Sequence, residues 1–173
     1  RLVDQINAVV LSGGSAFGLS ACSGVMEFLE EAKIGFSTSA GKVPIVVGLS
    51  LFDLGSGSST VRPGHQEGKE AASVASAIAP LGRVGAGAGA TVSKWRGKEF
   101  SELGGLGGAT LREGNLIVSC LIAVNASGDI DFGEYPDKIR DGHFSIPKLN
   151  PFENTTIGCL LYTSDAADEL TSV

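Results

Sequence analysis

The strongest constraint on the fold is a strand-turn-helix unit near the start of the chain. Residues 6–11 (INAVVL) form a short, β-branched apolar run, and the Ser-Gly-Gly sequence at 12–14 ends it. Ser15 is placed as the N-cap of a helix that extends to about Ala32. The apolar and polar faces of this helix are formed by Leu19, Cys22, Val25, Met26 and Leu29 and by Glu27, Glu30, Glu31 and Lys33. The unit predicts a domain that combines strands with helices.

Further apolar runs supply the other expected elements. Residues 45–52 predict a strand buried on both faces, residues 90–95 alternate like a strand, and residues 116–124 (LIVSCLIAV) predict another interior strand. Residues 66–78 predict a second, Ala-rich helix, and residues 104–108 (GGLGG) a tight glycine segment. The apolar stripe of the second helix consists of Ala71, Val74, Ala75 and Ile78. No repeat, linker or second domain is found.

Composition narrows the class of protein. The 173 residues suffice for one domain with a real core, 43% of them are hydrophobic, and the 25 glycines indicate many tight turns. The formal net charge is -6 and no Lys/Arg cluster occurs, which argues against a nucleic-acid partner. The longest apolar runs, such as residues 43–51, are far too short to span a membrane.

Neither the cysteines nor the histidines predict a metal site, and no cofactor is expected. Cys22, Cys120 and Cys159 lack metal-ligand spacing, and an odd number does not indicate a disulfide framework. Cys22 and Cys120 fall in helical and strand patterns and are expected to be reduced core residues, which favours a cytoplasmic location. His65 and His143 are expected as solvated loop residues without a spacing partner.

Residues 11–18 (LSGGSAFG) invite comparison with a nucleophile elbow, because a serine follows a strand and precedes a helix. The elbow requires Gly-x-Ser-x-Gly, and Phe17 occupies the position of the second glycine. A hydrolase with Ser15 as nucleophile is therefore not expected. The lysine of a phosphate-binding P-loop is also absent from this turn, which leaves a capped helix as the preferred interpretation.

The segment from Gly85 to Gly89, followed by Ala90, matches the relaxed dinucleotide fingerprint Gly-x-Gly-x-x-Ala. Its context does not fit, because a helix precedes it and a β-branched stretch follows where a helix should begin. We interpret it as a loop that permits close backbone packing. A non-catalytic or nucleotide-binding domain that uses this loop remains the alternative function.

Asn125 and the pair Asn154–Thr155 are the remaining candidate functional residues. Asn125 follows the strand at 116–124, where a side-chain amide can project into a cleft and donate to an oxyanion, although it can equally cap its own turn. Asn154 and Thr155 follow a long polar stretch, residues 131–153, and precede β-branched residues. An amide before a hydroxyl residue at such a junction suits a bond that cleaves itself and frees a threonine nucleophile, but an ordinary turn before a strand has the same sequence.

Seven motifs in order resemble one family. They are LSGGSAFGL (11–19), GVMEFLEE (24–31), VPIVVGLSLFDL (43–54), GAGAGATVSKW (85–95), GGLGGA (104–109), AVNASGDI (123–130) and NTTIG (154–158). Together they are similar to the DmpA-like L-aminopeptidase/D-esterase family, the β-aminopeptidase group of self-cleaving N-terminal-nucleophile hydrolases. The resemblance covers most of residues 3–158.

The resemblance implies an α+β fold, an αββα sandwich of the DmpA/ornithine-acetyltransferase-like type. It implies that the precursor cleaves itself between Asn154 and Thr155 and that Thr155 then acts as nucleophile, with the Asn125 side chain in the oxyanion hole. The implied reaction removes an N-terminal residue from a short peptide, amide or ester through an acyl-enzyme, without a metal. Assembly of processed subunits into a homo-oligomer is also implied. A tyrosine that some members place near the substrate amine is replaced by Ser93 here.

The two ends of the sequence bear on how much of this enzyme is present. The chain begins with Arg1 rather than Met, and residues 159–169 (CLLYTSDAADE) resemble a translated sequencing adapter. We therefore expect residues 1–158 to be a partial hydrolase domain and residues 159–173 to be a non-native tail. The family's further catalytic serine and glutamate are expected beyond Gly158, so this piece alone is expected to be inactive.

Overall fold

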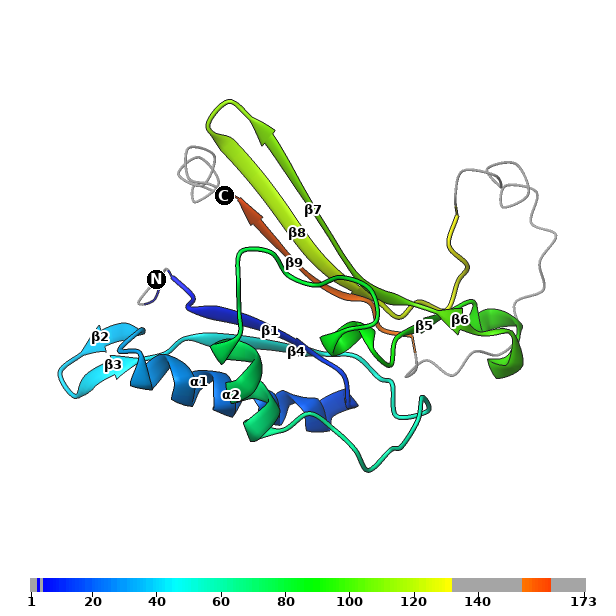
Figure 1. Cartoon of the computed structure of the whole chain (residues 1–173), viewed down its shortest axis with the longest axis horizontal. Helices are drawn as coiled ribbons and strands as arrows, with labels where there is room; N and C mark the ends of the chain where they lie inside the picture. The colour runs from blue at the N-terminus through cyan, green and yellow to red at the C-terminus, as the bar shows by residue number, and fades with distance from the viewer. Residues whose placement is uncertain (1–2, 4, 132–153, 163–173) are drawn as a thin grey trace.

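The computed structural model describes residue 3, residues 5–131 and residues 154–162 of the chain. The first layer consists of helices α1 (Ala21–Glu31) and α2 (His65–Ser73), which lie side by side on one face of a two-stranded parallel sheet (Figure 1). This sheet pairs β1 (Ala8–Ser12) with β4 (Val46–Ser50), with Ala8 opposite Val46 and Ser12 opposite Ser50. The strand-turn-helix prediction is confirmed in outline.

A second, antiparallel sheet lies on the other side of β1 and β4 (Figure 1). Its strands are β7 (Gly105–Glu113), β8 (Leu116–Val124) and β9 (Ile157–Tyr162), with β8 in the middle. Smaller elements surround the two sheets. They are the hairpin β2 (Phe36–Thr38) with β3 (Gly41–Val43), the pair β5 (Thr91–Val92) and β6 (Glu102–Leu103), and the 3₁₀ helices η1 (Ser15–Ser20), η2 (Gly85–Gly87), η3 (Lys94–Arg96) and η4 (Lys98–Phe100).

The core lies between the two sheets. Its buried members are Leu51, Ala86, Ala90, Ala123 and Ile157, and Leu11, Leu49 and Leu106 pack against them. Small side chains from η2 and the following loop therefore fill the space where the sheets approach each other. The described residues form a helix–sheet–sheet arrangement that agrees with the predicted α+β class, while the complete αββα sandwich remains a prediction.

The predicted N-cap at Ser15 is wrong. Ser15 has a φ of 55° and no side-chain cap, and its N–H donates to the Leu51 carbonyl over 2.9 Å. Because this bond fixes the turn to the end of β4, the chain first forms the 3₁₀ helix η1. The α-helix begins only at Ala21 and ends at Glu31.

The predicted helix at 66–78 is too long. α2 begins at His65, where the Gly64 N–H donates to Glu67 Oε2 over 2.9 Å, and it ends at Ser73. Val74 and Ile78, which were expected in an apolar stripe, are 72% and 87% exposed. The helices pack through small residues instead: a Cβ at Gly24 or Gly68 would overlap backbone of the facing helix.

The structure also differs from the predictions for residues 90–95, 104–108 and 45–52. The predicted strand at 90–95 shrinks to β5, because η3 begins at Lys94. The glycine segment at 104–108 is the start of β7, the longest strand together with β8. The strand expected to be buried on both faces, β4, is half-buried along most of its length.

Candidate active site

Asn125 directly follows β8 and is completely buried. Its Nδ2 donates to the Phe52 carbonyl over 2.9 Å, and its Oδ1 accepts from the Thr91 backbone N–H over 3.0 Å. A carbonyl on one side and an N–H on the other distinguish the two ends of the amide and fix its orientation. The side chain therefore bonds segments far from its own turn, which argues against the interpretation of Asn125 as a simple turn cap.

Lys94 is a charged partner of this amide. Its Nζ donates to Asn125 Oδ1 over 2.9 Å and to the Asn125 carbonyl over 3.1 Å. A cation on the amide oxygen draws electron density from the amide and makes its N–H groups stronger donors. Lys94 was not predicted as a site residue, because residues 90–95 were predicted to form a strand. The sequence contains no motif that relates this lysine to Asn125.

The backbone around Lys94 explains how its side chain reaches Asn125. Ser93 is buried and has a φ of 60°, the left-handed conformation, which turns the chain out of β5 and into η3. The Ser93 N–H donates to the Gly128 carbonyl over 2.9 Å, and the Trp95 N–H donates to the Ser127 carbonyl over 3.1 Å. These bonds hold the turn after Asn125 against the residues on both sides of Lys94.

The register of the second sheet relates Thr155 to Asn125. β8 and β9 pair with Ala123 opposite Ile157, and both of these side chains are buried in the core. Asn125 and Thr155 each lie two residues beyond this last pair, so the same register, if it were continued, would set Thr155 opposite Asn125. Thr155 is exposed and Asn154 is half-buried. The structure thus brings the predicted cleavage site to the end of β8 that carries Asn125.

His65 is exposed, as predicted, but it does not lie in a loop. It is the first residue of α2, and its Nδ1 lies 3.1 Å from Ser23 Oγ while its Nε2 lies 2.7 Å from Glu27 Oε2. Lys69 also contacts Glu27, and the hydrogen bond from Lys69 lowers the pKa of the Glu27 carboxyl, with His65 adding to the effect. This exposed cluster ties α2 to α1. Ser23 Oγ donates to the Ser20 carbonyl over 2.7 Å, so its proton is directed to its own helix. His143 lies outside the described residues.

The loop from Gly85 to Gly89 serves packing. Ala86 and Gly87 are buried in η2, and a Cβ at Gly87 would overlap backbone at Gly82 and Leu106. The strand β5 follows where a dinucleotide fold has a helix N-terminus. The interpretation of this segment as a close-packing loop is confirmed, and the nucleotide-binding alternative has no structural support.

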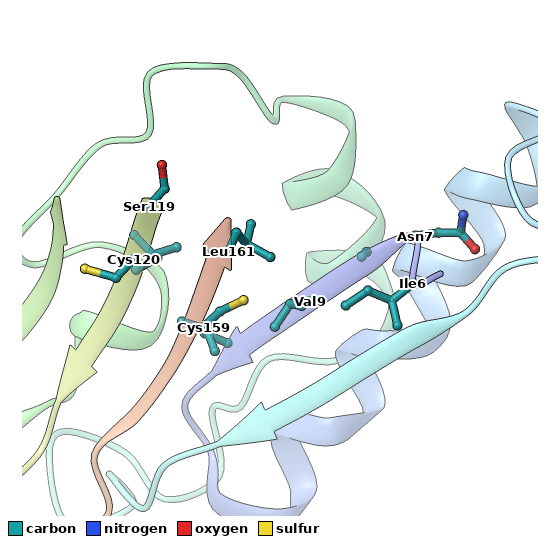
Figure 2. A pocket seen from close by; sticks show the side chains of 10 residues that line it. Ile6, Asn7, Val9, Ser119, Cys120, Cys159 and Leu161 are labelled. Carbon is teal, nitrogen blue, oxygen red and sulfur yellow. The ribbon is translucent and has the colours of Figure 1, made fainter. Parts of the chain in front are cut away.

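A cavity of about 390 Å³ lies between the two sheets, away from Asn125 and Thr155. Figure 2 shows Val9 of β1 on one wall and Cys159 of β9 on the other. Its other wall residues include Leu11, Ser119 and Leu121, so the lining is mostly apolar. The cavity lies between the two layers, and neither Asn125 nor Thr155 lines it.

The described ranges 5–131 and 154–162 contain neither a cluster typical of a metal site nor a membrane-spanning helix. In these ranges no three His, Cys, Asp or Glu side chains lie close enough together to hold a metal ion. No helix there is long and apolar enough to cross a membrane. The three cysteines are free, and Cys22 and Cys120, which were predicted to be core residues, are only half-buried.

Comparison with known proteins places the chain in a family of peptidases. The sequence profile of Peptidase family S58 matches residues 2–158, and the chain belongs to this family. The resemblance to the DmpA-like family is thereby confirmed.

Relatives with different names match the chain. A protein of Mycobacterium tuberculosis (strain ATCC 25618 / H37Rv), named as an uncharacterized aminopeptidase, is 39% identical over 125 residues, which are 72% of this chain and 35% of that protein. A 6-aminohexanoate-oligomer endohydrolase of Paenarthrobacter ureafaciens is 30% identical over 130 residues, which are 73% of this chain and 36% of that protein. The chain thus spans about a third of the length of the curated relatives it matches.

Proposed function

We propose that the complete protein is a self-processing amidohydrolase in which Thr155 is the N-terminal nucleophile and Asn125 the oxyanion donor. The observation that supports the proposal is the pairing of Ala123 with Ile157, which brings the Thr155 segment to the end of β8, next to the buried amide that Lys94 contacts. A donor that is already oriented stabilises developing negative charge without reorganisation during the reaction. Loss of one such donor lowers kcat by about 10²–10³-fold in other hydrolases.

Self-cleavage in this proposal begins with attack of Thr155 Oγ on the carbonyl carbon of Asn154. The carbonyl oxygen becomes negatively charged and accepts a hydrogen bond from the Asn125 amide. The C–N bond then breaks, the Thr155 nitrogen takes a proton, and an ester joins Asn154 to Thr155 Oγ. Water hydrolyses this ester and leaves Thr155 with a free α-amine.

Turnover repeats the same chemistry on a substrate. The α-amine of Thr155 has a reference pKa of about 7.7–8.0 and can take the proton of its own hydroxyl near neutral pH. Thr155 Oγ attacks the substrate carbonyl, the amine or alcohol leaves, and water releases the acyl group. Relatives named as aminopeptidases and as a hydrolase of 6-aminohexanoate oligomers support amide substrates that carry an amine.

The proposal also covers the assembly, the substrates and the cellular location of the protein. Processed subunits assemble into a homo-oligomer, substrates are short peptides, amides or esters, and the reduced Cys22 and Cys120 favour the cytoplasm. The activity belongs to the complete protein, of which residues 1–158 are one piece. Residues 159–162 pair with β8 as part of β9, and the apolar sequence CLLY suits a strand whatever its origin.

Mass spectrometry of the complete gene product tests the proposal. We expect two chains, the second beginning at Thr155, and a single uncut chain for Thr155→Ala. Thr155→Ser is the matched control, because it keeps a hydroxyl nucleophile and should still be cut. A wild-type protein that remains one chain, or a new N-terminus elsewhere, would contradict the proposal.

A further inference from the structure

We propose that Asp53 is a positioning residue that holds the Asn125 amide in its working orientation. The inference rests on the proposed function, since it matters for catalysis only if Asn125 is the oxyanion donor. Asp53 directly follows Phe52, whose carbonyl accepts the bond from Asn125 Nδ2. It lies in the segment after β4, half-buried beside the turn that follows β1.

The Asp53 carboxylate is held between two glycine turns. Its Oδ1 accepts a hydrogen bond from the Gly14 N–H over 2.6 Å. Its Oδ2 lies where a Cβ of Gly13 or of Gly89 would overlap it. Gly13 and Gly89 have no left-handed φ, so what these positions need is the space left by the missing side chain. Two segments, at 13–14 and at 89, therefore meet around a carboxylate that a third segment carries.

Both backbone groups that hold the Asn125 amide adjoin this contact. Phe52, whose carbonyl accepts from Nδ2, is one residue before Asp53. Thr91, whose N–H donates to Oδ1, is two residues after Gly89. The packing of Asp53 against Gly89 thus sets the spacing between the acceptor and the donor of the amide. If the two segments moved apart, Asn125 would lose one of its bonds and rotate away from the oxyanion.

A positioning role has a specific kinetic signature. The oxyanion exists in the transition state and not in the bound substrate, so a misplaced donor lowers kcat and leaves KM nearly unchanged. A displacement of about 1 Å at a catalytic group can cost about 10²-fold in rate. Loss of packing alone would instead lower the melting temperature without this selective effect on kcat.

The test uses the complete, processed enzyme and an aminoacyl p-nitroanilide that the wild type hydrolyses. We expect Asp53→Ala to lower kcat by about 10–10²-fold with KM within about twofold. Asp53→Asn keeps the shape and the acceptor for the Gly14 N–H, and it should restore most of the rate. The double variant Asp53→Ala/Asn125→Ala should be no slower than Asn125→Ala, because Asp53 acts through Asn125.

Gly89→Ala is an independent probe that leaves Asp53 in place. Its Cβ would displace the carboxylate and should reduce kcat in the same selective way, whereas in an Asp53→Ala background it should cost little more. If Asp53→Ala does not fold or is not processed, the rates of self-cleavage of Asp53→Asn and Gly89→Ala are compared with that of the wild type. If self-cleavage is slower in Gly89→Ala than in Asp53→Asn, the inference is supported. If both variants cleave themselves at the wild-type rate, the inference is overturned.

The outcomes separate the two proposals. If Asn125→Ala is inactive while Asp53→Ala keeps the wild-type kcat, the inference about Asp53 is wrong and the proposed function stands. If the losses of the two single variants multiply in the double variant, Asp53 acts independently and the inference is again wrong. A fully active Asn125→Ala variant would overturn both.

Discussion

Lys94 Nζ lies 2.9 Å from Asn125 Oδ1, so a cation contacts the oxygen of an amide that is completely buried. The same ammonium group donates to the Asn125 carbonyl over 3.1 Å. One lysine therefore fixes both the side chain and the backbone of the residue that ends β8. This pair is the centre of the candidate site, and it joins residues 31 positions apart.

Replacement of Lys94 should reduce catalysis more than substrate binding. We expect Lys94→Met, which keeps much of the length of the side chain without its charge, to lower kcat of the complete enzyme by about 10–10³-fold, because the Asn125 amide loses its polarising partner. Steady-state kinetics on an aminoacyl p-nitroanilide measure the effect. Lys98→Met is the matched control, since Lys98 is an exposed lysine in the neighbouring η4. A change confined to KM would argue against this role of Lys94.

Asn125 should also matter for stability. Asn125→Ala would leave the Phe52 carbonyl and the Thr91 N–H without their partner in the core, and each buried unpaired group costs about 1–3 kcal/mol. Urea denaturation in the Thr155→Ala background, which stays uncut with or without the Asn125 side chain, should show this loss. Gln66→Ala, at an exposed position of α2, should change the free energy of unfolding by less than about 0.5 kcal/mol. Equal effects of the two substitutions would show that the amide is not held as described.

The contact between the helices should be intolerant of added volume. A Cβ at Gly24 would overlap the His65 carbonyl, so Gly24→Ala should force α1 and α2 apart and cost about 1–3 kcal/mol. Gly128→Ala is the control, because a Cβ there meets nothing within 4 Å and its φ is not left-handed. Thermal unfolding followed by circular dichroism compares the two variants. Similar melting temperatures would mean that the helices do not pack at Gly24.

The cluster around Glu27 predicts a dependence of stability on pH. The hydrogen bond from Lys69 lowers the pKa of Glu27 below its ordinary value of 4.5, so its stabilising effect is present above that value. It is lost as the pH falls through the lowered pKa of the folded state. The pKa of Lys69 is raised, chiefly by its hydrogen bond to Glu27, so the lysine's contribution is lost only as the pH rises above its ordinary value of 10.5.

Urea midpoints between pH 3 and pH 7 check the acidic side of this dependence. Glu27→Gln should remove part of the loss in stability that the wild type shows on acidification. Glu30→Gln, which removes a charge from the same helix, should leave the dependence unchanged. The account of the cluster fails if Glu27→Gln and the wild type lose stability in parallel.

The order of elements was predictable from local signals, and the site only in part. The apolar runs at 6–11, 45–52 and 116–124 form strands, as their β-branched residues predicted, although the strands are half-buried along most of their length. The predicted helix at 66–78 was too long, because its apolar stripe did not reveal which residues face α1. α2 packs against α1 through Gly68, and the alanines did not extend the helix beyond Ser73. The strand β7 was missed because its glycines are read as turns, although in the sheet they allow close backbone approach.

Long-range contacts set the rest of the site. Asn125 was visible as an amide at the end of a strand, but its partners Phe52 and Thr91 come from distant segments that only the tertiary fold brings together. The position of the Lys94 side chain depends on the left-handed conformation of Ser93, and serine has no strong preference for this conformation. Pairing of β8 with β9 connects Thr155 to Asn125, and register across such a distance cannot be derived from one sequence.

The most direct test of the central claim is to locate the acyl group during turnover. The complete processed enzyme is mixed with an aminoacyl p-nitrophenyl ester, quenched in acid within its first turnover, and mapped by peptide mass spectrometry. The account predicts the mass of one aminoacyl group on the N-terminal peptide that begins with Thr155, and a smaller burst of acylation in Asn125→Ala. An aminoacyl group on another residue, Ser23 included, with Thr155 unmodified, would contradict it.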